Sequence, residues 1–160
     1  MESKNKTVLV TASAKRLGKF VAIDLIKKGW RIAIHYNKSK KLAEETADYL
    51  FKIGGNVSTH QADLTCVSDI EKLVKEIEEQ DSKWVGLINN AGYFNYDNGN
   101  SFRVEELHRH MSVNFIAPTL LTKALAKYTM KMTKKKSSSK GFVINILDAK
   151  IFGLNPDYYT

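Results

Sequence analysis

The sequence predicts an α/β protein built on a doubly wound parallel sheet with the strand order 3-2-1-4-5. Three observations predict it: short strands that are apolar throughout, amphipathic helical stretches between them, and regular alternation of the two along the chain. Strands without a polar face are buried on both sides, as in a parallel sheet covered by helices. Right-handed crossovers favour this order, and a flavodoxin-like order fits the same elements.

The first three elements are a strand, a helix and a strand. Residues 7–11 form a short apolar run, and residues 31–35 form another. The helix between them ends at Gly29, and its predicted inner face holds Leu17, Val21 and Leu25.

Two helices enclose the third strand, which is predicted over residues 56–61. The helix before it stops at Gly54-Gly55, and its predicted inner face holds Leu42, Thr46, Tyr49 or Leu50, and Ile53. The helix after it is predicted to open at Ser68, because Glu71 follows at capping-box spacing. Its buried stripe is predicted to hold Ile70, Leu73, Val74 and Ile77.

A long helix, predicted from about residue 104 to about residue 132, separates strands predicted at 84–88 and 142–147. Pro118 lacks the amide hydrogen that would bond the Asn114 carbonyl, so a kink is expected there. The kink either frees that carbonyl for a water or is a bend without function. A polar loop, 134–140, follows the helix. The predicted inner side of the helix holds Leu107, Met111, Pro118, Leu121, Leu125 and Met132.

Length and composition indicate one soluble globular domain, residues 1–160, without an internal repeat. Apolar residues make up 43% and charged residues 26%, a balance that argues against disorder. No apolar run has the ~20 residues of a membrane span, and no signal-peptide stretch opens the sequence. The single cysteine, Cys66, excludes an internal disulfide and a zinc site, and it is expected to be buried. We therefore expect a cytoplasmic protein that holds no metal.

The net charge of +8 is unevenly distributed along the chain. Residues 1–41 hold eleven Lys or Arg and two acids, residues 42–122 hold six and thirteen, and residues 123–160 hold eight and two. A DNA-binding domain more often has a basic recognition element with its own helical pattern. Here one basic block coincides with a turn suited to phosphate and the other with a Lys/Ser-rich loop. Nucleic acid is therefore not an expected partner.

The turn after the first strand, residues 11–18, is suited to a phosphate. It lies where a strand meets a helix N-terminus, whose free amides and dipole attract anions. Only Gly18 remains of the glycines of a G-x-G-x-x-G pattern, so an ordinary strand–helix turn is the alternative.

The stretch after the second strand favours a phosphate rather than a ribose hydroxyl. No acid lies between Asp24 and Glu44, whereas an NAD site places an acid near the end of this strand. Residues 35–39 offer cations and hydroxyls instead, with Lys15 and Arg16 nearby in the predicted fold. These groups suit the 2′-phosphate of NADP, and a solvated basic loop is the alternative.

Four motifs stand in order along the chain: Thr11 to Gly18, Ala62-Asp63-Leu64, Asn89-Asn90-Ala91-Gly92, and Asn114 in the long helix. With them the chain resembles the short-chain dehydrogenase/reductase family along essentially its whole length. It is most similar to the pteridine reductase branch in Thr-x-x-x-Lys-Arg-Leu-Gly, in His-Tyr-x-basic-Ser at 35–39, and in Asn-Ile-x-Asp-Ala at 145–149. The resemblance implies a Rossmann-like NADP-binding domain over residues 1–160 and NADPH-dependent reduction of a carbonyl or pterin-like substrate. Ala12 departs from the family pattern, which has glycine there.

The resemblance also implies roles for individual residues. The pyrophosphate would lie on the first turn, which holds Thr11, Ser13, Lys15, Arg16, Leu17 and Gly18. The 2′-phosphate would be bound by Lys38 and Ser39, within the cofactor-binding run His35, Tyr36, Asn37, Lys38 and Ser39. Asp63 and Leu64 would contact the adenine, and the nicotinamide ribose would meet Asn90, Ala91 and Gly92.

On the substrate side the resemblance implies contacts with Arg16, Phe94 and Asp148. Asn114 and Asp148 would serve catalysis, Asn114 through a water and Asp148 as a substrate-orienting or proton-donating group. The residues alone leave two alternatives open: an exposed loop aromatic at Phe94, and a strand-end aspartate that caps the next turn at Asp148.

The family delivers a proton from a Tyr-x-x-x-Lys pair, and its spacing from Asp148 puts both residues past Thr160. Tyr158 and Tyr159 are out of register and have no lysine four residues on. We therefore expect a truncated chain that lacks C-terminal strands and helices and is inactive alone. Two interpretations remain: a fragment of an NADP-dependent reductase, or a catalytically inactive nucleotide-binding or interaction module. The resemblance also implies a homo-oligomer through the long helix, 104–132.

Overall fold

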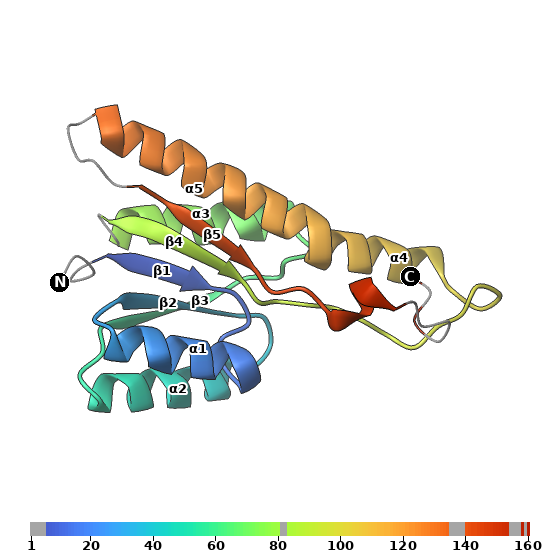
Figure 1. Ribbon diagram of the computed structural model, residues 1–160, viewed down its shortest axis with the longest axis horizontal. Helices are drawn as coiled ribbons and strands as arrows, with labels where there is room; N and C mark the ends of the chain where they lie inside the picture. The colour runs from blue at the N-terminus through green and yellow to red at the C-terminus, as the bar shows by residue number, and fades with distance from the viewer. Residues whose placement is uncertain (1–5, 81–82, 135–139, 154–157, 159) are drawn as a thin grey trace.

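Five parallel strands form the central sheet in the order β3-β2-β1-β4-β5 (Figure 1). The structure is a computed structural model that describes residues 6–80, 83–134, 140–153, 158 and 160. The order predicted from the sequence is confirmed, and the flavodoxin-like order is excluded. The strands lie within two residues of their predicted bounds: β1 (Thr7–Val10), β2 (Arg31–Tyr36), β3 (Val57–Gln61), β4 (Trp84–Asn89) and β5 (Phe142–Asn145).

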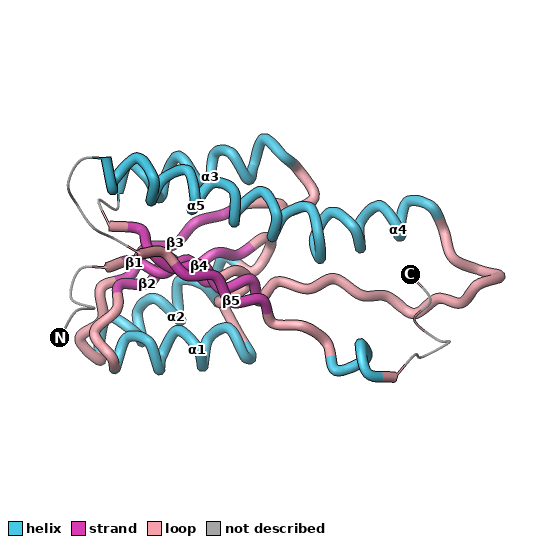
Figure 2. Tube along the Cα trace, turned by 45° about the horizontal axis from the view of Figure 1, so that its top comes forward, coloured by secondary structure: helices cyan, strands magenta, loops and turns pink. Residues whose placement is uncertain are grey.

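Helices cover both faces of the sheet, as the doubly wound arrangement requires (Figure 2). On one face lie α1 (Arg16–Lys27) and α2 (Lys40–Lys52). On the other lie α3 (Val67–Gln80) and α5 (Ala117–Lys134), the latter preceded by α4 (Val104–Met111), which extends beyond the carboxyl ends of the strands. A 3-10 helix, Ala149–Phe152, follows β5. None of the described helices is both long enough and apolar enough to span a membrane.

Each face of the sheet has its own core, because successive side chains of a strand point to opposite faces. On β1, Leu9 packs with the α3 and α5 face, and its neighbours Val8 and Val10 pack with the α1 and α2 face. The helices contribute Leu73, Ile77, Leu121 and Leu125 to the first core and Ala22, Ile26 and Leu50 to the second.

The buried faces of the first two helices differ from those predicted. The buried residues of α1 are Gly18, Ala22 and Ile26, one position on from the predicted stripe, and Leu17 is 53% exposed. In α2 the buried residues are Ala43, Thr46 and Leu50, so Thr46 and Leu50 are confirmed, whereas the predicted Leu42 and Ile53 are both 40% exposed. Small residues face the sheet in both helices, which lets the helices approach it closely, so the larger side chains are displaced outward. The stripe predicted for α3 is confirmed in Ile70, Leu73 and Ile77.

The start of α3 contradicts two expectations. The helix begins at Val67, and the amide of Ile70 donates to the carbonyl of Cys66 at 3.2 Å, so Ser68 lies inside the first turn. Ser68 therefore does not act as the N-cap of a capping box. Cys66 is exposed rather than buried, and its thiol lies 3.1 Å from the Ser68 hydroxyl. This hydrogen bond is the main cause that lowers the pKa of the Cys66 thiol.

The long helix is interrupted where the sequence predicts a kink. A π-helix, η1 (Ser112–Ile116), separates α4 from α5, and the amide of Ala117 donates to the carbonyl of Ser112 five residues before it. The wider turn shifts the helical phase between α4 and α5, so no single stripe runs through both helices, and Met111 of the predicted stripe is 45% exposed. The buried stripe of α5 is Ala117, Leu121, Leu125 and Tyr128. Most of the predicted loop at 134–140 lies outside the described residues.

Candidate functional site

One threonine hydroxyl and one asparagine amide join the carboxyl ends of β1 and β4. The hydroxyl of Thr11 accepts hydrogen bonds from the backbone amides of Asn90 and Ala91, both at 2.9 Å. The side-chain amide of Asn90 donates to the carbonyls of Thr11 at 2.9 Å and of Ala12 at 3.2 Å. We call this set of contacts the Thr11–Asn90 clamp. Open α/β sheets bind ligands where the strand order reverses, which here is between β1 and β4.

Gly18 is required by the close approach of α1 to the Thr11–Asn90 clamp. A Cβ at this position would lie 2.6 Å from the carbonyl oxygen of Ala12 and 2.7 Å from Nδ2 of Asn90. Only glycine therefore allows α1 to begin so close to the turn. The first amides of a helix have no partner within it, so those of α1 can bind a phosphate placed on this turn.

Ala12 and Arg16 adopt left-handed backbone conformations, with φ of 51° and 52°. A Cβ in this region costs roughly 1–2 kcal/mol. Ala12 therefore keeps a conformation that suits glycine, instead of changing the shape of the turn. Hydrogen bonds offset this cost, because the Ala12 amide donates to Nδ1 of His35 at 3.0 Å and its carbonyl accepts from Asn90.

The buried side chain of His35 connects the turn after β1 to the turn after β3. Its Nδ1 accepts from Ala12, and its Nε2 lies 3.1 Å from the carbonyl of Ala62, so a neutral ring protonated at Nε2 satisfies both partners. Burial lowers the pKa of His35 to about 4, which keeps the ring neutral near pH 7. The amide of Ser13 donates to the His35 carbonyl at 3.1 Å, and the Ser13 hydroxyl donates to Val10. The structure thus places His35 and Ser13 in supporting contacts, and direct contact with a cofactor stays a prediction.

A cavity of about 310 Å³ opens beside the turns that follow β1, β2, β3 and β4. Asp63 lies in its wall, and its Oδ1 accepts from the amide and the hydroxyl of Thr65 at 2.9 and 2.7 Å. The Thr65 amide is the main cause that lowers the pKa of Asp63, so the side chain is a carboxylate at neutral pH. An ionised carboxylate can accept from an amino group such as that of adenine. Other residues of the wall are Asn37, Lys38, Leu64, Arg109 and Val113.

A second cavity of about 850 Å³ opens on the other side of the turn after β4. Ala91, Gly92 and Tyr93 line both cavities, so an extended ligand can pass from one to the other along this turn. The remaining wall of the second cavity includes Leu17, Asn90, Phe94, Asn114, Ile146 and Asp148.

Asn114 holds the turn after β4 in place from the π-helix. Its Oδ1 accepts from the amide of Tyr93 at 2.8 Å, and its Nδ2 donates to the carbonyl of Tyr93 at 2.7 Å. This pair fixes the backbone that lies between the two cavities. Pro118 singles out the Asn114 carbonyl in the sequence, and no sequence pattern indicates this side-chain pairing.

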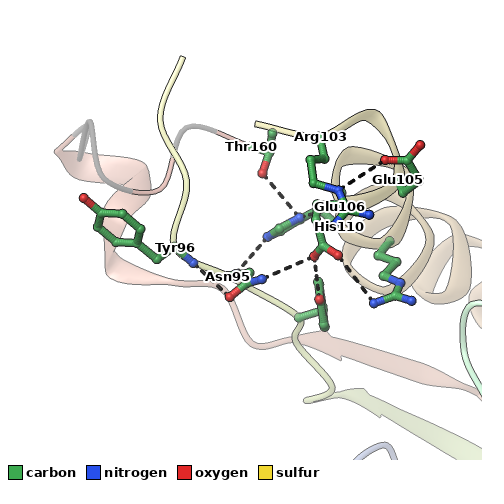
Figure 3. Close-up of polar contacts among 9 residues, drawn as sticks. Asn95, Tyr96, Arg103, Glu105, Glu106, His110 and Thr160 are labelled. Carbon is green, nitrogen blue, oxygen red and sulfur yellow. Dashed lines mark hydrogen bonds and ion pairs between the residues drawn. The ribbon is translucent and has the colours of Figure 1, made fainter. Parts of the chain in front are cut away.

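No sequence motif indicates the network that Tyr93, Glu106 and Arg109 form. The Tyr93 hydroxyl donates to Oε2 of Glu106 at 2.6 Å, and Nη1 of Arg109 donates to Oε1 at 3.4 Å. Figure 3 shows Glu106 among its partners, including the side chain of Asn95 at 3.5 Å. The Tyr93 hydroxyl is the main cause that lowers the pKa of Glu106. The one available sequence signal was the i, i+3 spacing of Glu106 and Arg109 on a helix.

The other predicted residues lie around these cavities at different depths. Arg16 is exposed and lines neither of the two cavities, so its contact with a substrate stays a prediction. Lys15 is exposed beside it, and Ser39 immediately precedes α2. Tyr36 is buried. Within the part of the chain that the structure describes, no three His, Cys, Asp or Glu side chains are grouped to hold a metal ion.

The chain matches the family model of the short chain dehydrogenases over residues 6–149. Among solved structures, it is similar to FolM alternative dihydrofolate reductase 1 from Brucella canis, crystallised with NADP. The two are 32% identical with a TM-score of 0.86, and the match covers 97% of this chain and 59% of that one.

Two curated proteins extend the comparison. An uncharacterized oxidoreductase of Thermotoga maritima is 29% identical over 146 residues, which are 91% of this chain and 55% of that protein. Hydroxynaphthalene reductase arp2 of Aspergillus fumigatus is 34% identical over 87 residues, which are 54% of this chain and 32% of that protein. The chain thus spans less than two thirds of the length of each of these proteins.

Replacing Thr11 by valine tests the Thr11–Asn90 clamp. The change preserves side-chain volume and leaves the amides of Asn90 and Ala91 without their acceptor. We expect the free energy of unfolding in urea to fall by about 2–4 kcal/mol, since each buried unpaired donor costs about 1–3 kcal/mol. Thr133→Val is the control, because it removes an exposed hydroxyl that only bonds its own helix. Equal losses in both variants would contradict the clamp.

Proposed function

Because the chain belongs to the short-chain dehydrogenase family, we propose that it is the NADPH-binding domain of a reductase that acts on a carbonyl or pterin-like substrate. One observation carries this proposal: the two cavities share the turn Ala91–Tyr93, and the connection from β1 into α1 contributes Ala12 to the first and Leu17 to the second. A dinucleotide has this layout, with a pyrophosphate between two bases. The first cavity would take the adenine, and the second the nicotinamide and substrate.

The residues of the site fit a dinucleotide. Gly18 leaves room that a Cβ would fill, and the free amides of α1 suit the pyrophosphate. In the first cavity, the Asp63 carboxylate suits the adenine amino group, and Leu64 supplies an apolar wall. When bound, the reduced nicotinamide supplies the hydride for the reaction. The family relative from Brucella canis, crystallised with NADP, supports the same cofactor.

The 2′-phosphate of NADPH accounts for the charges around the first cavity. Lys38 lies in the cavity wall, and Ser39 precedes α2 beside it. The acid-free stretch between Asp24 and Glu44 removes the carboxylate that would repel a phosphate. A cation that contacts this phosphate would discriminate NADPH from NADH.

The second cavity favours a planar substrate. Phe94 lies in its wall, and the ring of Tyr158 contacts the rings of Phe94 and Tyr96, with centroids 5.9 and 6.0 Å apart. Exposed aromatic rings offer stacking surfaces for a flat ring system. Two of the relatives are named as reductases of dihydrofolate and of hydroxynaphthalene, which are both fused-ring compounds. We propose a fused-ring carbonyl or imine as the substrate class.

The described residues of the site do not include the proton-donating tyrosine–lysine pair that the reduction would need. Reduction needs a proton at the atom that becomes negatively charged. Both polar atoms of the Asn114 side chain are hydrogen-bonded to the Tyr93 backbone. Asp148 lies in the wall of the second cavity and is the candidate that would orient the substrate. Neither is the tyrosine–lysine pair that the family resemblance implies. We propose that residues 1–160 alone bind NADPH without turnover, as an inactive nucleotide-binding module would also do.

The discrimination of the two cofactors is the first test. We expect NADPH to bind residues 1–160 more tightly than NADH in calorimetric titrations. Lys38→Ala should weaken NADPH by about tenfold and leave NADH unchanged, since only NADPH carries the extra phosphate. Lys41→Ala is the matched control, because it removes the same charge on the exposed face of α2. Equal affinities of the unaltered chain for both cofactors would remove the 2′-phosphate assignment.

Turnover is the second test. Purified residues 1–160 should show no steady oxidation of NADPH with a dihydropterin, because general acid catalysis typically contributes ~10²–10⁴-fold. The whole protein, with any residues that follow Thr160, serves as the comparison. Steady turnover by residues 1–160 would refute the proposed need for a further proton donor.

We also propose that a second copy of the chain covers the outer face of the long helix. Met111 and Ile116 are 45% and 41% exposed there, and Phe115, which also lines the second cavity, is 61% exposed, although all three are apolar. Burial of such a surface stabilises association at about 25 cal/mol per Å² before the entropic cost of association. Sedimentation over a wide concentration range should show a dimer that Met111→Glu dissociates, since Met111 lines neither cavity. A monomer at all concentrations would refute this assignment.

A further inference from the structure

Arg109 is a cation in the first cavity for which the proposed function has no role. It lies on α4, one helical turn before Val113, which lines the same cavity. The other cation of this cavity, Lys38, comes from the opposite side of the fold, after β2. Between them, Leu64 and Ala91 supply apolar wall, and Asp63 supplies a carboxylate.

The guanidinium of Arg109 is held at the cavity by its neighbours. Glu106, one turn earlier on α4, accepts from Nη1 through Oε1 at 3.4 Å. The other oxygen of Glu106 accepts from the hydroxyl of Tyr93 at 2.6 Å, and Tyr93 itself lines the cavity. The Arg109 side chain is 59% exposed, and the Glu106 carboxylate, 16% exposed and bonded to Tyr93, is the contact that directs its guanidinium toward the cavity wall.

The shape of the two cations separates their roles. Each faces a carboxylate, Arg109 that of Glu106 and Lys38 that of Asp63, so charge alone does not distinguish them. A planar, weakly hydrated guanidinium instead suits the face of an aromatic ring, where the π electrons attract the cation. The apolar residues beside Arg109 suit a ring as well.

We propose that Arg109 is an adenine-binding residue whose guanidinium contacts the ring face of the cofactor while Asp63 accepts from its amino group. This inference rests on the proposed function, since it assumes an adenine nucleotide in the first cavity. It assigns Arg109 a contact that is independent of the 2′-phosphate. The contribution of Arg109 should therefore be the same for NADPH and NADH.

The test compares Arg109→Ala with two further variants by calorimetric titration of residues 1–160. We expect Arg109→Ala to raise the Kd for NADPH and for NADH by the same factor, about three- to tenfold. Arg109→Lys keeps the charge without the planar fork and should recover part of the loss. Arg103→Ala is the matched control, because Arg103 is a 71% exposed arginine that pairs with Glu105 outside the cavity (Figure 3). It should leave both values unchanged.

Three outcomes would overturn the assignment. A loss confined to NADPH would place Arg109 at the 2′-phosphate, and unchanged affinities for both cofactors would remove it from the site. Equal losses in Arg109→Ala and Arg103→Ala would indicate only a change in surface charge. Failure of the unaltered chain to bind either cofactor would instead refute the proposed function, and the adenine contact with it.

Discussion

The buried hydroxyl of Thr11 is the contact on which the candidate site depends. It accepts the amides of Asn90 and Ala91, and so connects two strands that meet where the sheet reverses its order. The side-chain amide of Asn90 donates to the carbonyls of Thr11 and Ala12 in the turn after β1. Because Gly18 has no Cβ, α1 can begin in contact with this turn. The Thr11–Asn90 clamp therefore positions the N-terminus of α1 and the turn that lines both cavities.

Residues of the site divide into those that support it and those that face a ligand. His35, neutral through burial, holds the strained Ala12 from beneath, and Asn114 holds the wall between the cavities through Tyr93. Few side chains are left to face a dinucleotide, chiefly those of the first cavity. Residues of one sequence motif can therefore have different roles: some hold the backbone turns in place, and others line the cavities.

The sequence predicted the fold well, because fully apolar strands and the turns after them are set by local pattern. The stripe of α3 follows from periodicity alone, and the sheet order follows from periodicity together with the preference for right-handed crossovers. Periodicity failed at Leu17 and Met111, because small residues bring α1 close to the sheet and the π-helix shifts the phase of the long helix. Arg109 was not predictable from a motif, since its place in the first cavity depends on the packing of α4 beside the turn that follows β4. Tertiary packing decided each of these cases.

The central claim is that one dinucleotide occupies both cavities across the clamped turn. Amide chemical shifts of ¹⁵N-labelled residues 1–160, followed during titration with NADPH, test it most directly. The account predicts saturable shifts with a single Kd in the turn at 13–18, at Asp63 and Leu64 in the first cavity, and at Gly92 and Phe94 toward the second. Shifts confined to one cavity, or spread over basic surfaces without saturation, would contradict it.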